Sequence, residues 1–173
     1  QCDKEGKLWI GTAGGGLNML DLTNDFFVRY RRNPNDSNSI SGNVVRSIFI
    51  DNDNIIWAGT ISKGLSSYNK STGKFTRYLV PVFKNENNKS DASIFSIIPV
   101  YSKSSELWVS TGRGLYSLNK STGNFIYNDI YNGNSSKDQN IVSACMDRSG
   151  ILWLSTYFEG LHKYYLNMDK FTS

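Results

Sequence analysis

The sequence predicts an all-β chain of β-propeller blades, each blade a four-stranded antiparallel sheet. Three observations predict this fold. The four tryptophans, Trp9, Trp57, Trp108 and Trp153, stand in near-identical contexts at steps of 48, 51 and 45 residues. Each is followed by a Gly-Leu pair, and a Phe follows each of those leucines by ten residues. A fixed period of this length is typical of propellers and solenoids.

The pattern inside one repeat is that of strands. The run around each Trp, residues 56–60 in the second repeat, is short, apolar and rich in β-formers, which predicts a strand buried on both faces. The Gly-Leu pair opens the next strand, where Gly supplies a positive φ. Asn-Lys-Ser-Thr-Gly runs then predict tight turns. The last strands are expected at 75–78 and 125–127, and the first strands at 44–50, 94–100 and 141–146.

We expect a single partial propeller over residues 1–173, with about 3.6 blades. The blades are predicted at 1–30 with most of its first strand missing, and at 44–78, 93–127 and 140–173. The sequence begins in mid-motif, which indicates a piece of a longer protein. A partial ring leaves two apolar faces open to water, so we expect association with missing blades or self-association of two copies.

An Asp stands six residues before the Trp in three repeats, as Asp3, Asp51 and Asp147, with Gly or Asn three residues after it. This spacing favours a type I turn with the Gly or Asn in the left-handed conformation. A calcium loop around Asp51 and Asp53 is disfavoured, because the further acidic positions and the central Gly are missing. The third repeat lacks this Asp, so we expect a longer, irregular turn at 101–106.

The connections between repeats, at 31–43, 79–93 and 129–140, are long and polar, as functional loops often are. Strand order places them on the same rim as the turns between the second and third strands. Sugar recognition on this rim needs aromatic platforms and polar side chains. The candidates are Arg31, Arg32, Lys63, Arg113, Tyr157 and Phe158. Ordinary surface or inter-blade packing is the alternative for each.

Composition excludes several classes. An apolar content of 39% is that of a soluble globular protein, and this sequence shows neither a membrane span nor a signal peptide. The net charge of +4 is scattered, which argues against nucleic-acid binding. Cys2 and Cys145 are expected to be small core residues without a bridge. No cofactor, metal or catalytic group is expected.

An enzymatic alternative is a propeller glycosidase or lyase. It needs a carboxylate pair, such as Glu159 with Asp129 or Asp138, on the long-loop side. Nothing in the sequence places these groups near each other. His162, the single histidine, is expected to be a bystander, and no hydrolase or phosphate-loop motif occurs.

The motif Asp-x-x-Gly-x-Leu-Trp-Ile-Gly-Thr, followed by Gly-Gly-Leu, Tyr-Asn and Thr-Gly-x-Phe, resembles the two-component regulator propeller repeat. That repeat builds the periplasmic sensor domains of Bacteroides-type hybrid two-component systems. The resemblance implies a fragment of a seven-bladed ring, a membrane-anchored histidine kinase elsewhere in the protein, and an oligosaccharide ligand that controls polysaccharide-utilisation genes. The expected function is periplasmic carbohydrate sensing and signal transduction without catalysis by this segment. A structural or protein-docking propeller is the alternative.

Overall fold

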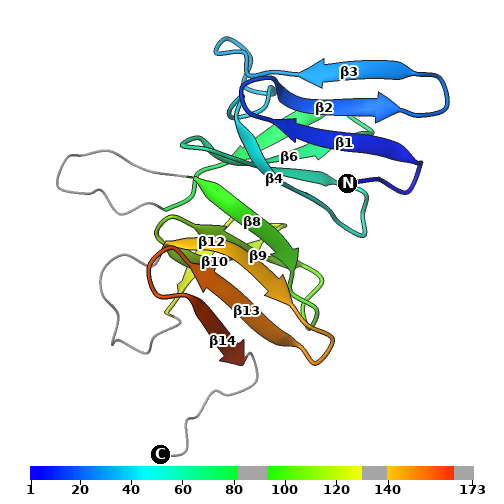
Figure 1. The fold of residues 1–173 in the computed structure, drawn as a ribbon. Coiled ribbons are helices and arrows are strands. Elements are labelled where there is room, and N and C mark those ends of the chain that lie inside the picture. Colours follow the sequence, from blue (N-terminus) through cyan, green and yellow to red (C-terminus); the bar gives the residue numbers. More distant parts are fainter. Residues whose placement is uncertain (82–92, 130–139, 166–173) are drawn as a thin grey trace, which may run out of the picture.

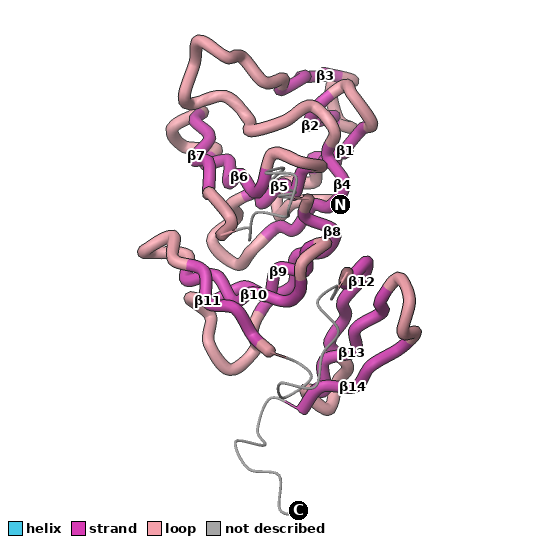
Figure 2. Tube along the Cα trace, turned by 90° about the vertical axis from the view of Figure 1, so that its left-hand side faces the viewer, coloured by secondary structure: helices cyan, strands magenta, loops and turns pink. Residues whose placement is uncertain are grey.

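The computed structural model describes residues 1–81, 93–129 and 140–165, which form strands and turns only (Figure 2). None of these residues belongs to a helix long and apolar enough to cross a membrane. The strands form four antiparallel sheets that follow one another along the chain (Figure 1). The predicted all-β fold is therefore confirmed.

The strands of each sheet pair in chain order, so every sheet is a meander. The first sheet holds β1 (Lys7–Thr12), β2 (Gly16–Asp21) and β3 (Phe26–Tyr30). The second holds β4 (Val45–Ile50), β5 (Ile56–Thr60), β6 (Gly64–Asn69) and β7 (Lys74–Tyr78). The third holds β8 (Ile94–Pro99), β9 (Glu106–Thr111), β10 (Gly114–Asn119) and β11 (Phe125–Asn128). The fourth holds β12 (Ile141–Met146), β13 (Ile151–Thr156) and β14 (Leu161–Tyr165).

The second and third sheets are the four-stranded blades that the repeat predicts. In the first sheet, an isolated bridge between Cys2 and Leu8 stands where the first strand was expected to be mostly missing. In the fourth sheet, the expected last strand lies outside the described residues. The first strands lie innermost, with β4 against both β1 and β8, and β12 against β8 (Figure 1). The sheets thus fan out like propeller blades without closing a ring.

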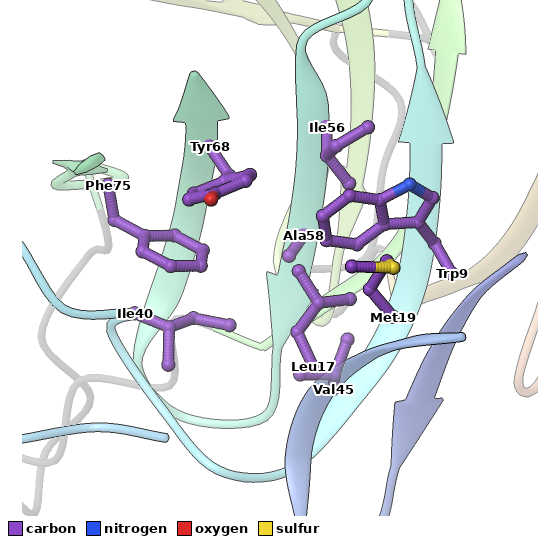
Figure 3. Packing of buried hydrophobic residues seen from close by; sticks show 9 residues of the cluster. All are labelled: Trp9, Leu17, Met19, Ile40, Val45, Ile56, Ala58, Tyr68 and Phe75. Carbon is purple, nitrogen blue, oxygen red and sulfur yellow. The ribbon is translucent and has the colours of Figure 1, made fainter. Parts of the chain in front are cut away.

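Aromatic side chains fill the space between neighbouring sheets. Trp9 of the first sheet packs on Tyr68 of the second with 5.6 Å between ring centroids, and Tyr68 packs on Phe75 at 4.7 Å (Figure 3). Trp57 and Trp108 are buried against the following sheets in the same way. These three tryptophans therefore lie between neighbouring sheets, and Trp153 is half-buried.

The recurring phenylalanine follows this rule only in part. Phe75 is buried against the first sheet, but Phe27 is 47% exposed. The two side chains point from opposite faces of the sheet: the recurring Phe faces the preceding blade, and the Trp faces the following one. No described sheet covers the side of the first sheet on which Phe27 lies. Phe171 falls outside the described residues.

The Asp that precedes the Trp in three repeats forms a turn and also bonds to other side chains. The Oδ1 atom of Asp3 accepts the backbone N–H groups of Glu5 and Lys7, as the turn predicts. Its Oδ2 atom accepts the Trp9 indole N–H at 2.9 Å and the Lys70 ammonium of the second sheet at 2.9 Å. We call this arrangement the Asp–Trp–Lys bridge. The sequence predicted the turn, with positive φ at Gly6, Asn54 and Gly150, but not the bridge.

The bridge recurs one sheet later. Asp51 Oδ2 accepts the Trp57 indole N–H at 3.0 Å and the Lys120 ammonium of the third sheet at 3.1 Å. Both side chains of this ion pair are largely buried, with 5% of Asp51 and 15% of Lys120 exposed. The Asp51 carboxylate therefore joins the second and third sheets. This agrees with the interpretation of residues 51–54 as a turn and not as a calcium-binding loop.

The third sheet departs from the pattern, as expected. Its turn between β8 and β9 runs from Val100 to Ser105, and Val100 takes the position of the Asp, since its N–H bonds to the carbonyl of Glu106. Val100 offers no carboxylate. The Trp108 indole N–H accordingly has no acceptor among the described residues, although the side chain is buried.

The prediction that the cysteines are core residues is wrong. Cys2 and Cys145 are both free and exposed. Cys145 pairs with Trp153 across β12 and β13, on the face of the fourth sheet that no described sheet covers. Its counterparts Phe49 and Ile98 pack against core clusters because a following sheet covers them.

The close approach of neighbouring sheets is testable at Gly59. A Cβ added there would lie 2.6 Å from Cγ2 of Ile94 on the next sheet and closer still to Oγ of Ser47 on the neighbouring strand. We expect Gly59→Ala to lower the free energy of unfolding by about 2–3 kcal/mol, measured by denaturant titration. Gly150→Ala is the control, because it adds a methyl group in open space at a positive φ and should cost about 1 kcal/mol. Equal losses in both variants would contradict the packing argument.

The first Asp–Trp–Lys bridge makes stability depend on pH. Burial raises the pKa of Asp3, but hydrogen bonds from Trp9, Lys70 and two backbone amides outweigh burial and lower this pKa from 3.8 to about 2. The stabilisation is therefore complete above about pH 4 and is lost as the pH falls towards about 2. In denaturant titrations, the stability difference between wild type and Asp3→Asn should stay constant down to about pH 4 and shrink below it. A stability difference that does not change between about pH 4 and pH 2 would show that the Asp3 carboxylate is not the source of the pH dependence.

Candidate functional site

All three long connections end at one edge of the sheets. The carbonyl of Asn43, just before β4, accepts the N–H groups of Gly14 and Gly16 in the turn between β1 and β2. On the fourth sheet, the carbonyl of Asn140 accepts the Tyr157 N–H at 3.0 Å. On the second, the Ser62 N–H bonds to Ser93 Oγ at 3.0 Å. These contacts confirm the shared edge, which we call the long-loop rim. Residues 82–92 and 130–139 lie outside the described part.

The first connection is held in place by an arginine that the sequence did not single out. Arg77 of β7 donates from Nε to the Ser39 carbonyl at 2.8 Å and from Nη2 to the Asp36 carbonyl at 2.7 Å. Ser39 Oγ in turn caps the turn by bonding to the carbonyls of Asn33 and Asp36. This loop is therefore a fixed support for the residues beside it.

Two adjacent aromatic rings stand out from the rim. Tyr157 and Phe158, between β13 and β14, are 68% and 77% exposed. Their rings contact each other edge to face, with centroids 4.9 Å apart and an interplanar angle of 68°. The Glu159 N–H bonds to Thr156 Oγ1 at 3.0 Å and fixes the turn below them. An exposed, mutually supported aromatic pair is an apolar platform with a hydroxyl at one end.

The basic candidates are distributed over the other sheets. Arg31 and Arg32 follow β3 and are exposed, and the Arg32 N–H bonds to Asn43 Oδ1 at 2.7 Å. Lys63 is exposed in the turn between β5 and β6, with its stem against Gly42. Arg113 is half-buried in the turn between β9 and β10. The six sequence-predicted residues thus share one rim but come from all four sheets, and Tyr157 with Phe158 is the pair whose contact is established.

The opposite edge, which carries the Asp turns and the Thr-Gly turns, is the short-turn rim. An open groove of about 680 Å³ lies there between the second and third sheets. Its lining includes Asp53, Tyr78, Tyr101 and Glu106, and Tyr101 is 71% exposed. Sequence reasoning missed this groove. The signal for it is the longer turn of the third repeat, which carries Tyr101 and Glu106 into the groove wall.

The single histidine lies beside one of the carboxylates that a glycosidase would need. His162 Nε2 lies 3.9 Å from Glu159 Oε2, so the glutamate of the imagined glycosidase pair faces an imidazole. Asp138 lies outside the described residues. Among those residues, no group of three or more His, Cys, Asp or Glu side chains is arranged to hold a metal ion.

A family model matches two segments of the chain. Residues 39–62 and 135–158 match the family model described as two component regulator propeller. Each match spans the end of a connection, an inner strand, the Asp turn and the Trp strand. No curated protein sequence matches the chain.

Solved structures agree with this match. The extracellular domain of the hybrid two-component system BT3049 from B. thetaiotaomicron is 26% identical over 97% of this chain, with a TM-score of 0.77. The BT4673 extracellular domain from the same organism is 24% identical over 97% of the chain, with a TM-score of 0.78. The chain spans only 23% and 20% of those two structures.

A third structure confirms the architecture alone. The WD40 β-propeller domain of Doa1 is 14% identical over 98% of the chain, with a TM-score of 0.65, and the chain covers 50% of it. The more similar of these structures are extracellular domains of two-component systems. The chain is therefore a partial β-propeller, and two of its segments match the two-component regulator propeller model.

Proposed function

We propose that this chain is the ligand-sensing, periplasmic segment of a hybrid two-component sensor histidine kinase. The observation that carries the proposal is its 26% identity, over 97% of the chain, to the extracellular domain of such a system. The segment, taken as one partial propeller over residues 1–173, recognises the ligand and leaves phosphoryl transfer to a kinase elsewhere in the protein. A bound ligand biases the receptor by favouring one arrangement of the propeller against its neighbours.

The proposed ligand is an oligosaccharide, whose detection signals to polysaccharide-utilisation genes. The apolar face of a sugar ring packs on aromatic side chains, and Tyr157 with Phe158 offers such a platform on the long-loop rim. Arg31, Arg32, Lys63 and Arg113 supply hydrogen-bond donors on the same rim. Arg77 holds the connection that carries Arg31 and Arg32. Because this backbone is already fixed, ligand binding does not have to order it.

Titration calorimetry against a panel of host and plant oligosaccharides tests this proposal. One member of the panel should bind to wild type, and Tyr157→Ala with Phe158→Ala should weaken that binding by about tenfold or more. Both side chains are more than two-thirds exposed, so their removal should leave the fold intact. Phe26→Ala on β3, which removes another exposed ring, is the matched control and should bind like wild type.

Three other outcomes have distinct meanings. Loss of binding in Tyr101→Ala, with Tyr157→Ala unaffected, would move the site to the groove on the short-turn rim. No binding by any oligosaccharide would count against sugar sensing and favour the structural or protein-docking alternative. Shortened products from the same panel would instead support a glycosidase or lyase.

A further inference from the structure

The fourth sheet presents a face that its counterparts keep covered. Leu161 of β14 is 65% exposed, whereas the equivalent Leu17, Leu65 and Leu115 are fully buried. Trp153 and Tyr165 lie on the same face, and Tyr165 is 45% exposed. The Lys163 ammonium lies 5.5 Å from the Trp153 ring centroid and 4.7 Å from that of Tyr165. This is the side on which a following blade packs in the rest of the molecule.

The edge of this face carries half of an Asp–Trp–Lys bridge. Asp147 Oδ2 accepts the Trp153 indole N–H at 2.9 Å, and its Oδ1 accepts the N–H groups of Ser149 and Ile151. Asp3 and Asp51 make the same bonds and, in addition, each accepts a lysine ammonium from the next sheet. Asp147 is thus oriented as an acceptor for a cation that a following blade brings.

The position of that cation is fixed by the repeat. Lys70 and Lys120 each stand six residues after the Gly of a Gly-Leu pair, at the start of a turn between the third and fourth strands of a blade. The same position is Leu22 in the first sheet and, by sequence, Leu166 in the fourth, which lies outside the described residues. At the two junctions where the structure describes both positions, an Asp meets a Lys: Asp3 meets Lys70 and Asp51 meets Lys120.

We propose that the face of Trp153, Leu161 and Tyr165 is a docking surface for a propeller blade whose equivalent turn begins with lysine. The same chemistry selects against the first sheet of a second copy of this chain. Head-to-tail joining of two copies would place Leu22 opposite Asp147. That contact covers Asp147 without adding a cation from the facing sheet and leaves it the charge of Lys163 on its own sheet. This is less favourable at a buried junction than a carboxylate paired across the junction. The self-association of two copies that the sequence suggested is therefore mismatched at this point.

Sedimentation velocity of the chain at increasing concentration tests the proposal. Leu22 is 60% exposed in its turn, so Leu22→Lys supplies the missing cation without loss of core packing. We expect Leu22→Lys to strengthen self-association over wild type on the order of fivefold at low salt, and less at high salt. Adding Asp147→Asn should remove this gain. Leu79→Lys, at a side chain 93% exposed elsewhere, adds the same charge and should produce no gain.

Two results would overturn the proposal. The first is equal behaviour of wild type and Leu22→Lys, whether both associate or both stay monomeric. The second is a gain that survives Asp147→Asn, because the added lysine would then act elsewhere. Neither measurement involves an oligosaccharide, so the result does not depend on the function proposed above.

Discussion

The structure depends on burying an indole ring between sheets without leaving its N–H group unpaired. A buried polar group without a partner is costly, and in three of the four sheets the Asp six residues before the Trp supplies the acceptor. One carboxylate then joins the turn, the ring and, at two junctions, the next sheet. The third sheet is the exception, because Val100 stands in the place of the Asp and the Trp108 N–H has no acceptor among the described residues.

This bridge also divides the molecule into two unlike edges. The short-turn rim carries the Asp turns and the lysine-bearing turns, whose length and residue types the bridge constrains. The long-loop rim has no such requirement, and its connections differ in length and composition from one repeat to the next. Binding residues are often found on loops that a rigid scaffold positions and whose sequence the fold does not constrain. This is the physical reason for proposing the ligand site on the long-loop rim.

Residues at the junctions, as well as the connectivity of the chain, favour one order of the sheets. Apolar burial alone would let any blade pack on any other, because every repeat offers the same Trp and Leu. The turn residue and the Asp position add a charge condition at two junctions, through Lys70 with Asp3 and Lys120 with Asp51, and the junction at Val100 lacks it. In a repeat fold, such differences stabilise one arrangement of neighbours over alternatives that bury similar area.

The sequence determined the strands and their order, because four copies of one local pattern repeat the same apolar phase and the same turn residues. Predicted and observed strand ends agree to within a residue or two, and the shared rim of the loops follows from strand order. Only the tertiary structure decided what lies across a junction. The lysine that pairs with Asp3 is Lys70, and no local pattern connects residues so far apart. The exposure of Phe27, Cys145 and Leu161, like the groove beside Tyr101, depends on which sheet faces are covered, and coverage is a property of the assembled sheets.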